Sequence, residues 1–262
     1  MFKLEKLMSI VDDVAPLSIS YETIDNGGYD NSGLIVKCSD SVNKILFSLD
    51  LSNKVVEMAE ELGCDTIITH HPAIYNPVKT LSIDGDTAPI VKAVKLGINI
   101  VSMHLNLDMA IGGIDECLSQ GLGVKNGEII DKLNNPDYGY GRQGIIEQKS
   151  AKQFLSDAKK TFESDGIIFY GTSDVNKVAS FCGSGSDHAL KAIENSIVDA
   201  DTIVTSDIPH HVLKELIELG KNVMIIPHYV SEEYGFNKFY ESVLQSLNGK
   251  VRAYYFADKR FM

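Results

Sequence analysis

Six of the seven histidines in this 262-residue sequence lie where a predicted strand ends or in the loop that follows one. They are His70, His71, His104, His210, His211 and His228, whereas His188 is predicted on the surface of a helix. Imidazole nitrogens bind transition-metal ions and also exchange protons near neutral pH. The positions of these residues therefore point to metal-dependent chemistry at strand ends.

The segment THHPAIYNP places two adjacent histidines, His70 and His71, at the end of a buried strand. Pro72 follows at once and prevents a helix from starting there. Neighbouring residues within a strand point to opposite faces, but a turn at the strand end can direct both rings towards neighbouring ions. Taken alone, the pair is more typical of one strand cap and one exposed side chain, so a metal-binding interpretation depends on other residues.

Two further strand ends supply carboxylates with histidines. SMHLNLDMAIGG contains His104 and Asp108 in what the flanking glycines predict to be a loop, and IIPHYVSEEYGF contains His228 and Glu232 at helical spacing. Two ions held about 3.5–4 Å apart need a bridging ligand, which a carboxylate can provide. The combination of histidines and carboxylates therefore predicts a two-metal site.

A rival constellation lies in TSDIPHHVLKE, where Asp207, His210 and His211 are followed by Glu215. Asp207 is equally well placed to cap a helix, with the two histidines in its first turn beside an apolar stripe. The glycine- and serine-rich segment 183–186 joins a strand to a helix and could bind a phosphate or carboxylate there, or serve as a plain turn. Both alternatives stay open on the sequence alone.

The elements that must position these residues alternate between strand and helix. A strand over 44–50 precedes a helix that ends at Gly63, and TIITHH and INIVSMH are strands separated by a helix ending at Gly97. A second alternating set runs from about residue 144 to a final strand, VRAYYF. This order predicts an α/β fold with helices on the sheet faces, in which ligands gather at the carboxyl ends of strands. The polar segment from about residue 124 to 143 is the best candidate for a linker or an excursion between two lobes.

Composition narrows the classes of function. The 36 acidic and 24 basic residues give a formal net charge of −12, and no long basic cluster is present, which disfavours a nucleic-acid partner. The N-terminal segment lacks the roughly 20 apolar residues of a membrane span and is predicted to be an amphipathic helix. The four cysteines are singly spaced, which predicts mostly buried, reduced thiols and a cytoplasmic protein.

The sequence resembles the NIF-three-like (YbgI-type) family, whose members are often labelled GTP cyclohydrolase type 2 homologues. The resemblance is carried by YDNSGLIV, ILFSLDLS, DTIITHHPAIY, HLNLDMAIGGID, VASFCGSGSD, DTIVTSD and PHYVSEE in this order, and it covers the chain from about Tyr29 onwards. Ser206 stands where the family usually has glycine in TGD, and segment 183–185 replaces a more continuous glycine run. These departures concern the substrate pocket rather than the ligands.

The resemblance implies one NIF-three-like unit over residues 1–262, built from two α/β lobes of mixed sheets flanked by helices. The lobes would span about 1–125 and 126–262, with 226–262 returning to a metal site in the cleft between them. The implied ligands of two divalent ions per chain are His70, His71, Asp108, His228 and Glu232, with Glu232 bridging and His104 close by as an acid/base residue. Zinc is the first expectation, with iron, manganese or nickel as alternatives. A ring-shaped homohexamer is also implied.

These features favour a metal-dependent hydrolase in which His104 and Glu232 take part in catalysis on a small, nucleotide-like substrate. The family label would make the reaction an attack of water on the purine ring of GTP or on a similar C–N or phosphoester bond. No Walker-type lysine loop for a triphosphate is present. The alternative is a metal-binding regulatory or interaction protein with structural ions.

Overall fold

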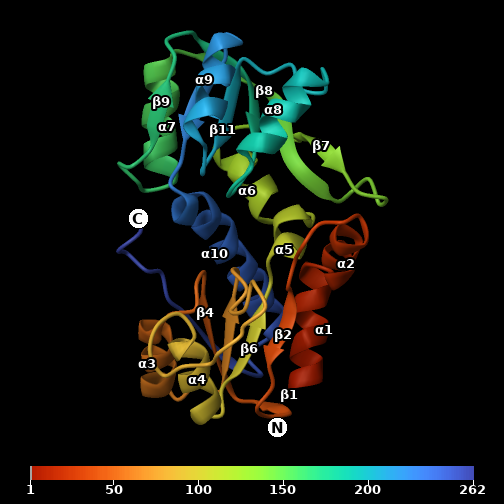
Figure 1. Cartoon of the computed structure of the whole chain (residues 1–262), viewed down its shortest axis with the longest axis vertical. Coiled ribbons are helices and arrows are strands. Elements are labelled where there is room, and N and C mark those ends of the chain that lie inside the picture. Colours follow the sequence, from red (N-terminus) through yellow and green to blue (C-terminus); the bar gives the residue numbers. More distant parts are fainter. Residues whose placement is uncertain (1) are drawn as a thin grey trace. The chain divides into compact units, whose positions relative to one another are not determined.

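The computed structural model describes residues 2–262, which form two compact units (Figure 1). Unit 1 comprises residues 2–107 and Phe236–Asp258, and unit 2 comprises Asp108–Gly235 and Lys259–Met262. Two of the three boundaries fall inside helices, α5 (Leu105–Met109) and α10 (His228–Leu247), and the third lies between Asp258 and Lys259 near the C-terminus. The predicted single family unit, with lobes meeting near residue 125, stays a prediction.

Unit 1 contains a five-stranded mixed sheet in the order β13-β4-β5-β6-β2. Strand β13 pairs parallel with β4, β4 with β5 and β5 with β6, whereas β2 runs antiparallel to β6. The strands are β2 (Gly33–Val36), β4 (Lys44–Ser48), β5 (Thr66–Thr69), β6 (Asn99–Ser102) and β13 (Arg252–Tyr255), and β1 (Phe2–Lys3) pairs separately with β3 (Ser41–Val42). The helices are α1 (Leu4–Val14), α2 (Leu17–Asp25), α3 (Asn53–Leu62) and α4 (Ala88–Lys95), together with the later part of α10.

Helix α3 begins and ends where its sequence dictates. The Ser52 hydroxyl accepts a hydrogen bond from the Val55 N–H, which satisfies one of the free donors at the helix start. Gly63 ends the helix in the left-handed conformation with φ of 67°, which glycine adopts at no steric cost. The buried side chains of α3 pack with α4 against Leu46, Ile67 and Ile100 on one sheet face.

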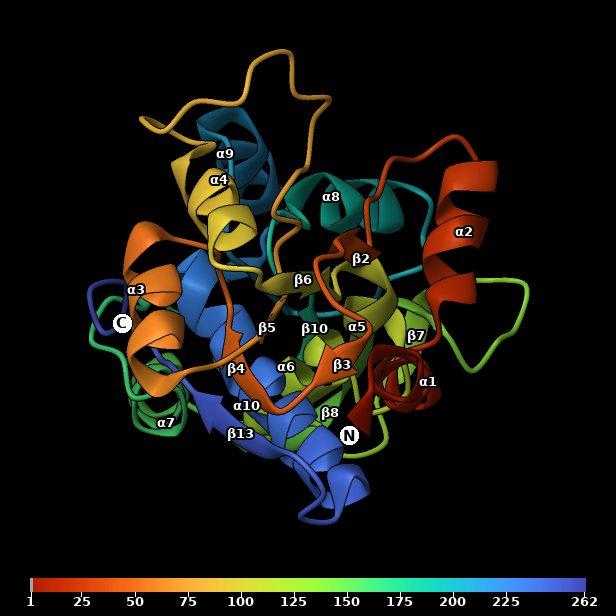
Figure 2. The same ribbon diagram turned by 90° about the horizontal axis from the view of Figure 1, so that it is seen from below.

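The opposite face of this sheet is covered by the later part of α10. Phe47 of β4 contacts the rings of Phe236, Phe239 and Tyr240 at centroid distances of 6.4, 6.1 and 5.1 Å. Figure 2 shows α3 and α4 on one side of β4 and α10 on the other. Residues of these strands are therefore buried on both faces, as in other sheets with helices on both sides.

Unit 2 contains a six-stranded mixed sheet in the order β7-β8-β10-β11-β12-β9, in which β10, β11 and β12 are parallel. The strands are β7 (Glu128–Lys132), β8 (Gly139–Lys149), β9 (Ile168–Tyr170), β10 (Val175–Ser180), β11 (Thr202–Thr205) and β12 (Asn222–Ile225). The helices are α6 (Ile114–Gly121), α7 (Ala151–Thr161), α8 (Ser186–Glu194) and α9 (His210–Glu218), with the first part of α10.

Helix α10 approaches α6 closely at a glycine. A Cβ atom added to Gly235 would lie 2.6 Å from the Cα of Ile114, the first residue of α6. No side chain fits there without a shift of the helices. The nearest atom belongs to the backbone, which cannot move aside as the end of a flexible side chain can. The contact sets the position of the α10 segment that follows β12.

The predicted α/β class with mixed sheets and helices is confirmed, but two local predictions were wrong. The predicted loop that contains Asp108 forms helix α5, although glycines flank it. The polar segment 124–143 is not the unstructured linker that was one of its two predicted roles, because it contains β7 and the start of β8, which pair antiparallel as a hairpin. Its polarity reflects exposed side chains on an edge strand.

Cys64, Cys117 and Cys182 are buried, Cys38 is exposed, and none of these four described cysteines forms a disulfide bond. The prediction of mostly buried thiols is confirmed. No helix within residues 2–262 combines the length and the apolar character that crossing a membrane requires.

Candidate metal centre

The carboxyl ends of three parallel strands in unit 1 bring polar side chains to one sheet edge. Ser48 of β4 pairs with Thr69 of β5, which pairs with Ser102 of β6, so the three strands end level. Asp50, the His70–His71 pair and His104 follow these ends directly. The predicted strand-end histidines of this unit therefore meet at one place, as expected for an α/β sheet.

The three imidazole rings lie together at this edge. The ring centroids of His70 and His71 are 4.9 Å apart, those of His70 and His104 5.3 Å, and those of His71 and His104 6.0 Å. His70 is buried, and His71 and His104 are partly exposed. The turn after β5 thus directs the rings of two adjacent residues to the same side.

Each of these histidines has an oxygen acceptor at Nδ1. His70 Nδ1 lies 2.8 Å from the Met103 carbonyl, His71 Nδ1 lies 2.7 Å from Asp50 Oδ1, and His104 Nδ1 lies 2.7 Å from Asp30 Oδ1. Such an acceptor assigns the ring proton to Nδ1 and leaves the Nε2 lone pair for another partner. This is the arrangement by which proteins orient histidines that bind metals.

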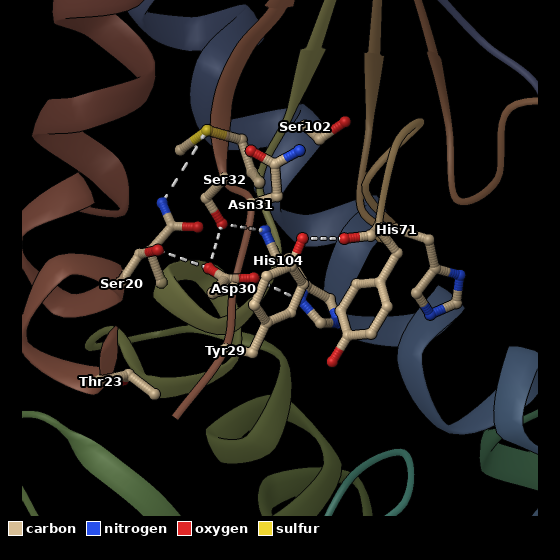
Figure 3. Close-up of polar contacts among 12 residues, drawn as sticks. Ser20, Thr23, Tyr29, Asp30, Asn31, Ser32, His71, Ser102 and His104 are labelled. Carbon is tan, nitrogen blue, oxygen red and sulfur yellow. Dashed lines mark hydrogen bonds and ion pairs between the residues drawn. The ribbon is translucent and has the colours of Figure 1, made fainter. Parts of the chain in front are cut away.

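Asp30 accepts hydrogen bonds from several side chains besides His104 (Figure 3). Its carboxylate accepts hydrogen bonds from the hydroxyls of Ser20 at 2.5 Å and Ser32 at 2.7 Å in addition to His104. The Ser32 hydroxyl also accepts the backbone N–H of His104. Burial raises the pKa of Asp30, but the bonds from His104, Ser20 and Ser32 outweigh it and hold the pKa below its ordinary value. Asp30 is therefore a carboxylate at neutral pH, and it fixes His104 firmly.

Asp50→Asn is expected to weaken metal binding by about 10- to 100-fold, because an amide no longer fixes the His71 tautomer as a carboxylate does. Titration with Zn²⁺ in competition with a chromophoric chelator measures the effect. Asp84→Asn, in an exposed loop, is the matched control. Unchanged Zn²⁺ affinity in Asp50→Asn would show that His71 binds no ion.

Unit 2 repeats the strand-end arrangement. The parallel strands β10, β11 and β12 are followed by Gly183, Asp207 and His228, and Thr205 at the end of β11 pairs with Ile225 at the end of β12. His228 Nδ1 lies 2.6 Å from Asp207 Oδ2, and His228 Nε2 lies 3.0 Å from Glu232 Oε1 one helical turn later in α10. Both nitrogens of one imidazole thus face carboxylates, a geometry that requires a cation at Nε2, either a proton or a metal ion.

Gly183 lies directly against this pair. Its φ is +56°, and a Cβ atom there would lie 2.6 Å from Glu232 Oε1 and 3.5 Å from His228 Nε2. Glycine is therefore required both by the backbone conformation and by the space that the Glu232 carboxylate occupies. The glycine- and serine-rich segment accordingly has a role in shaping this site, in addition to connecting β10 to α8.

Asp108 belongs to a buried polar cluster in unit 2. The Cys182 thiol lies 3.6 Å from Asp108 Oδ1, and the Cys182 backbone N–H donates to Asp115 Oδ1 at 3.1 Å. Burial, followed by the charges of Asp108 and Asp115, raises the pKa of Cys182 well above its ordinary value. Cys182 is therefore a neutral thiol beside the Asp108 carboxylate.

Asp115 forms a buried ion pair with Arg142, whose Nη1 lies 3.3 Å from Asp115 Oδ2. Burial raises the pKa of Asp115 to about 6, although Arg142 and backbone N–H groups lower it. Because this pKa exceeds the ordinary value of 3.8, the folded state binds the proton more tightly than the unfolded state between these two values. The contribution of Asp115 to stability therefore rises as pH falls through 6.

Asp115→Asn removes this titration. We compare the free energies of unfolding of the wild type and of Asp115→Asn. The wild type should gain about 1 kcal/mol relative to the variant when the pH is lowered from about 7 to about 5. Urea unfolding of metal-free protein at the two pH values measures the difference. A difference that falls on acidification would show that Asp115 keeps a low pKa in the folded state.

The structure places each predicted residue. Unit 1 brings together His70, His71 and His104, and unit 2 brings together His228 and Glu232 and buries Asp108. In the rival constellation, Asp207 does not cap α9, whose N-cap is Pro209, but binds His228 instead, and His210 and His211 are exposed. Asp30 and Asp50 were not predicted as site residues, although Asp50 follows a buried strand, which is the same signal that identified the histidines.

The donor chemistry fits divalent transition-metal ions. Groups of histidine, aspartate and glutamate side chains that could hold an ion are present among residues 2–262. Imidazole nitrogens with carboxylate oxygens suit Zn²⁺, Fe²⁺ and Mn²⁺ better than Ca²⁺ or Mg²⁺, which prefer oxygen ligands alone. The buried His, Asp and Glu side chains could therefore bind metal ions.

A comparison with known families agrees with these observations. The sequence profile of the Duf34/NIF3 (NGG1p interacting factor 3) family matches residues 2–259. The chain belongs to this family. A Duf34/NIF3 relative in Clostridium perfringens, called "GTP cyclohydrolase 1 type 2 homolog", is 29% identical over 255 residues, which cover 95% of this chain and 94% of the relative.

Solved structures show the same Duf34/NIF3 fold. The Staphylococcus aureus hypothetical protein SA1388 is 25% identical with a TM-score of 0.85, covering 98% of this chain and 97% of that one. Reduced HcgD from Methanocaldococcus jannaschii is 27% identical with a TM-score of 0.80, covering 97% of each chain. The predicted family and fold are confirmed.

Proposed function

We propose that this protein binds two divalent metal ions and uses them to hydrolyse a small, nucleotide-like substrate. The observation that carries the proposal is that His70, His71, His104 and His228 each have Nδ1 held by a carboxylate or carbonyl oxygen. This orientation is not explained by packing alone, because the buried Asp30 carboxylate loses hydration when it fixes His104. Metal binding supplies the reason for the arrangement.

In this proposal His70, His71, Asp108, His228 and Glu232 are the ligands. The continuity of two helices supports this grouping. Phe236 of α10 packs on the His70 ring at a centroid distance of 6.2 Å, and Glu232 lies one turn earlier in the same helix. Asp108 likewise lies in α5, which begins directly after His104. Glu232, next to His228 Nε2, is the proposed bridging ligand.

The bound ions would lower the pKa of water and polarise an oxygen of the substrate. His104 supplies the acid/base step, because Asp30 fixes its Nδ1 proton and leaves Nε2 to accept a proton from the attacking water. Asp30 also stabilises the imidazolium that results, since its own charge is maintained by three hydrogen bonds. His104 then returns the proton to the leaving nitrogen or oxygen.

The relatives' name makes GTP the first substrate to test, together with phosphodiesters and small amides. Protein loaded with Zn²⁺, Fe²⁺ or Mn²⁺ is assayed for formate, phosphate and amine release, with Glu232→Ala as the matched control. Activity is expected in the wild type and lost in Glu232→Ala. Equal activity in both would indicate a contaminant and overturn the assignment of the site.

The ring-shaped homohexamer implied by the family resemblance stays a prediction. Size-exclusion chromatography with light scattering gives the mass directly, and about six times 28.8 kDa is expected.

A further inference from the structure

Two tyrosines flank His104 and expose much of their rings. Tyr29 precedes Asp30, and Tyr75 lies in the loop that follows His71. Their side chains are 47% and 45% exposed, although tyrosine rings bury well in protein cores. Burial in the core of unit 1 therefore does not explain these two rings.

The two rings are held in place. Their centroids are 5.1 Å apart at an interplanar angle of 85°, and the Tyr75 ring also meets the His104 ring at 5.8 Å and 84°. The Tyr29 hydroxyl donates a hydrogen bond to the Tyr75 carbonyl. Next to it, the Asn31 side-chain amide donates to the Ile74 carbonyl at 2.5 Å. Segments 29–31 and 74–75 are thus tied together beside His104.

The polar groups around His104 are already engaged, so they offer little to a ligand. The Asp30 carboxylate accepts three hydrogen bonds, and Ser32 bonds both to Asp30 and to the His104 backbone. Figure 3 shows Tyr29 on the same side of this cluster as His104. What the cluster presents outwards is aromatic surface next to an imidazole whose Nε2 is available to act.

We propose that Tyr29 and Tyr75 bind a planar heteroaromatic ring of the substrate by aromatic contact and thereby place its reacting bond beside His104. This inference rests on the proposed role of His104. Aromatic stacking is worth about 1–3 kcal/mol per nucleobase, which is enough to govern selection of a small ligand. Recognition through aromatic contact also suits a chain with a net charge of −12, because that charge repels anionic groups at a distance.

The test compares nucleoside monophosphates with ribose 5-phosphate, which has the sugar and the phosphate but no nucleobase. Isothermal titration calorimetry measures the affinity of the zinc-loaded chain for GMP, AMP and CMP, and for ribose 5-phosphate. The wild type should bind the best nucleotide at least about tenfold more tightly than ribose 5-phosphate. Tyr29→Ala and Tyr75→Ala should each lose about five- to tenfold of the nucleotide affinity and leave the ribose 5-phosphate affinity unchanged.

Conservative variants separate ring contact from loop order. Tyr75→Phe keeps the ring and the backbone carbonyl, and Tyr29→Phe removes only the hydroxyl that bonds to Tyr75. Both should bind the nucleotide within about threefold of the wild type. Zinc content measured for every variant shows whether the metal site is intact.

The inference is overturned if the wild type prefers no nucleotide over ribose 5-phosphate, or if the alanine variants keep full nucleotide affinity. It is also overturned if the alanine variants keep their zinc but lose affinity equally for the nucleotide and for ribose 5-phosphate. Its failure is distinct from that of the proposed function. Ring-dependent binding without hydrolysis of any substrate would contradict the hydrolase alone, whereas hydrolysis with unaffected alanine variants would contradict the tyrosine site alone.

Discussion

Asp108→Ala should reduce the metal content of the purified protein from about two ions per chain to one or none. The substitution removes a buried carboxylate. The other proposed ligands are mostly imidazoles, so a divalent ion depends on this carboxylate for part of the negative charge that balances its own. Inductively coupled plasma mass spectrometry of protein purified without chelator gives the stoichiometry. Asp84→Ala, at an exposed loop position, is the matched control and should keep both ions.

A second variant, Asp108→Asn, keeps the shape of the side chain and removes only the charge. Circular dichroism of both variants establishes that the fold is intact before the ions are counted. Two ions per chain in a folded Asp108→Ala protein would remove Asp108 from the ligand set. The remaining ligands would then have to be reassigned.

Gly235→Ala should destabilise the protein by about 3 kcal/mol. The new methyl group would lie 2.6 Å from the Cα of Ile114, so α6 or α10 must shift. Alanine favours a helix over glycine by about 1 kcal/mol, which offsets only part of this cost. Urea unfolding measures the change, with Gln245→Ala at an exposed position of the same helix expected to stay within about 0.5 kcal/mol of the wild type.

The zinc affinity of Gly235→Ala should also fall, because Gly235 lies less than one turn after Glu232 in α10. Neutral or improved stability in Gly235→Ala would mean that α6 and α10 lie farther apart than described. In that case Glu232 would also be free of this constraint.

The histidines at strand ends could be predicted from the sequence because one physical rule connects them. Parallel strands place their carboxyl ends at one edge, so residues that follow His-bearing strands must meet even when they are distant in sequence. This rule brought together His70, His71 and His104. The choice of Glu232 as the bridging ligand rests on the family resemblance, since spacing alone left open which of the two carboxylates bridges.

Roles that depend on tertiary contacts could not be predicted in this way. Asp207 has the sequence position of a helix cap, and only the pairing of β11 with β12 brings it to His228. Asp30 reaches His104 across 74 residues. Helix α5 has only five residues, too few to be stable alone, so tertiary contacts rather than local preference decide that Asp108 is helical.

Helix α10 carries the proposed metal ligand Glu232 and the core residue Phe236 about one turn apart. Glu232 and Phe236 are separated by about 6 Å along the helix axis, and Phe236 packs on Phe47 and on the His70 ring. A substitution that changes the packing around Phe47 would therefore move α10 and with it the Glu232 carboxylate, although Glu232 is not part of that packing. Descendants of this sequence can thus tune their affinity for metal by exchanging one hydrocarbon side chain for another while every ligand stays the same.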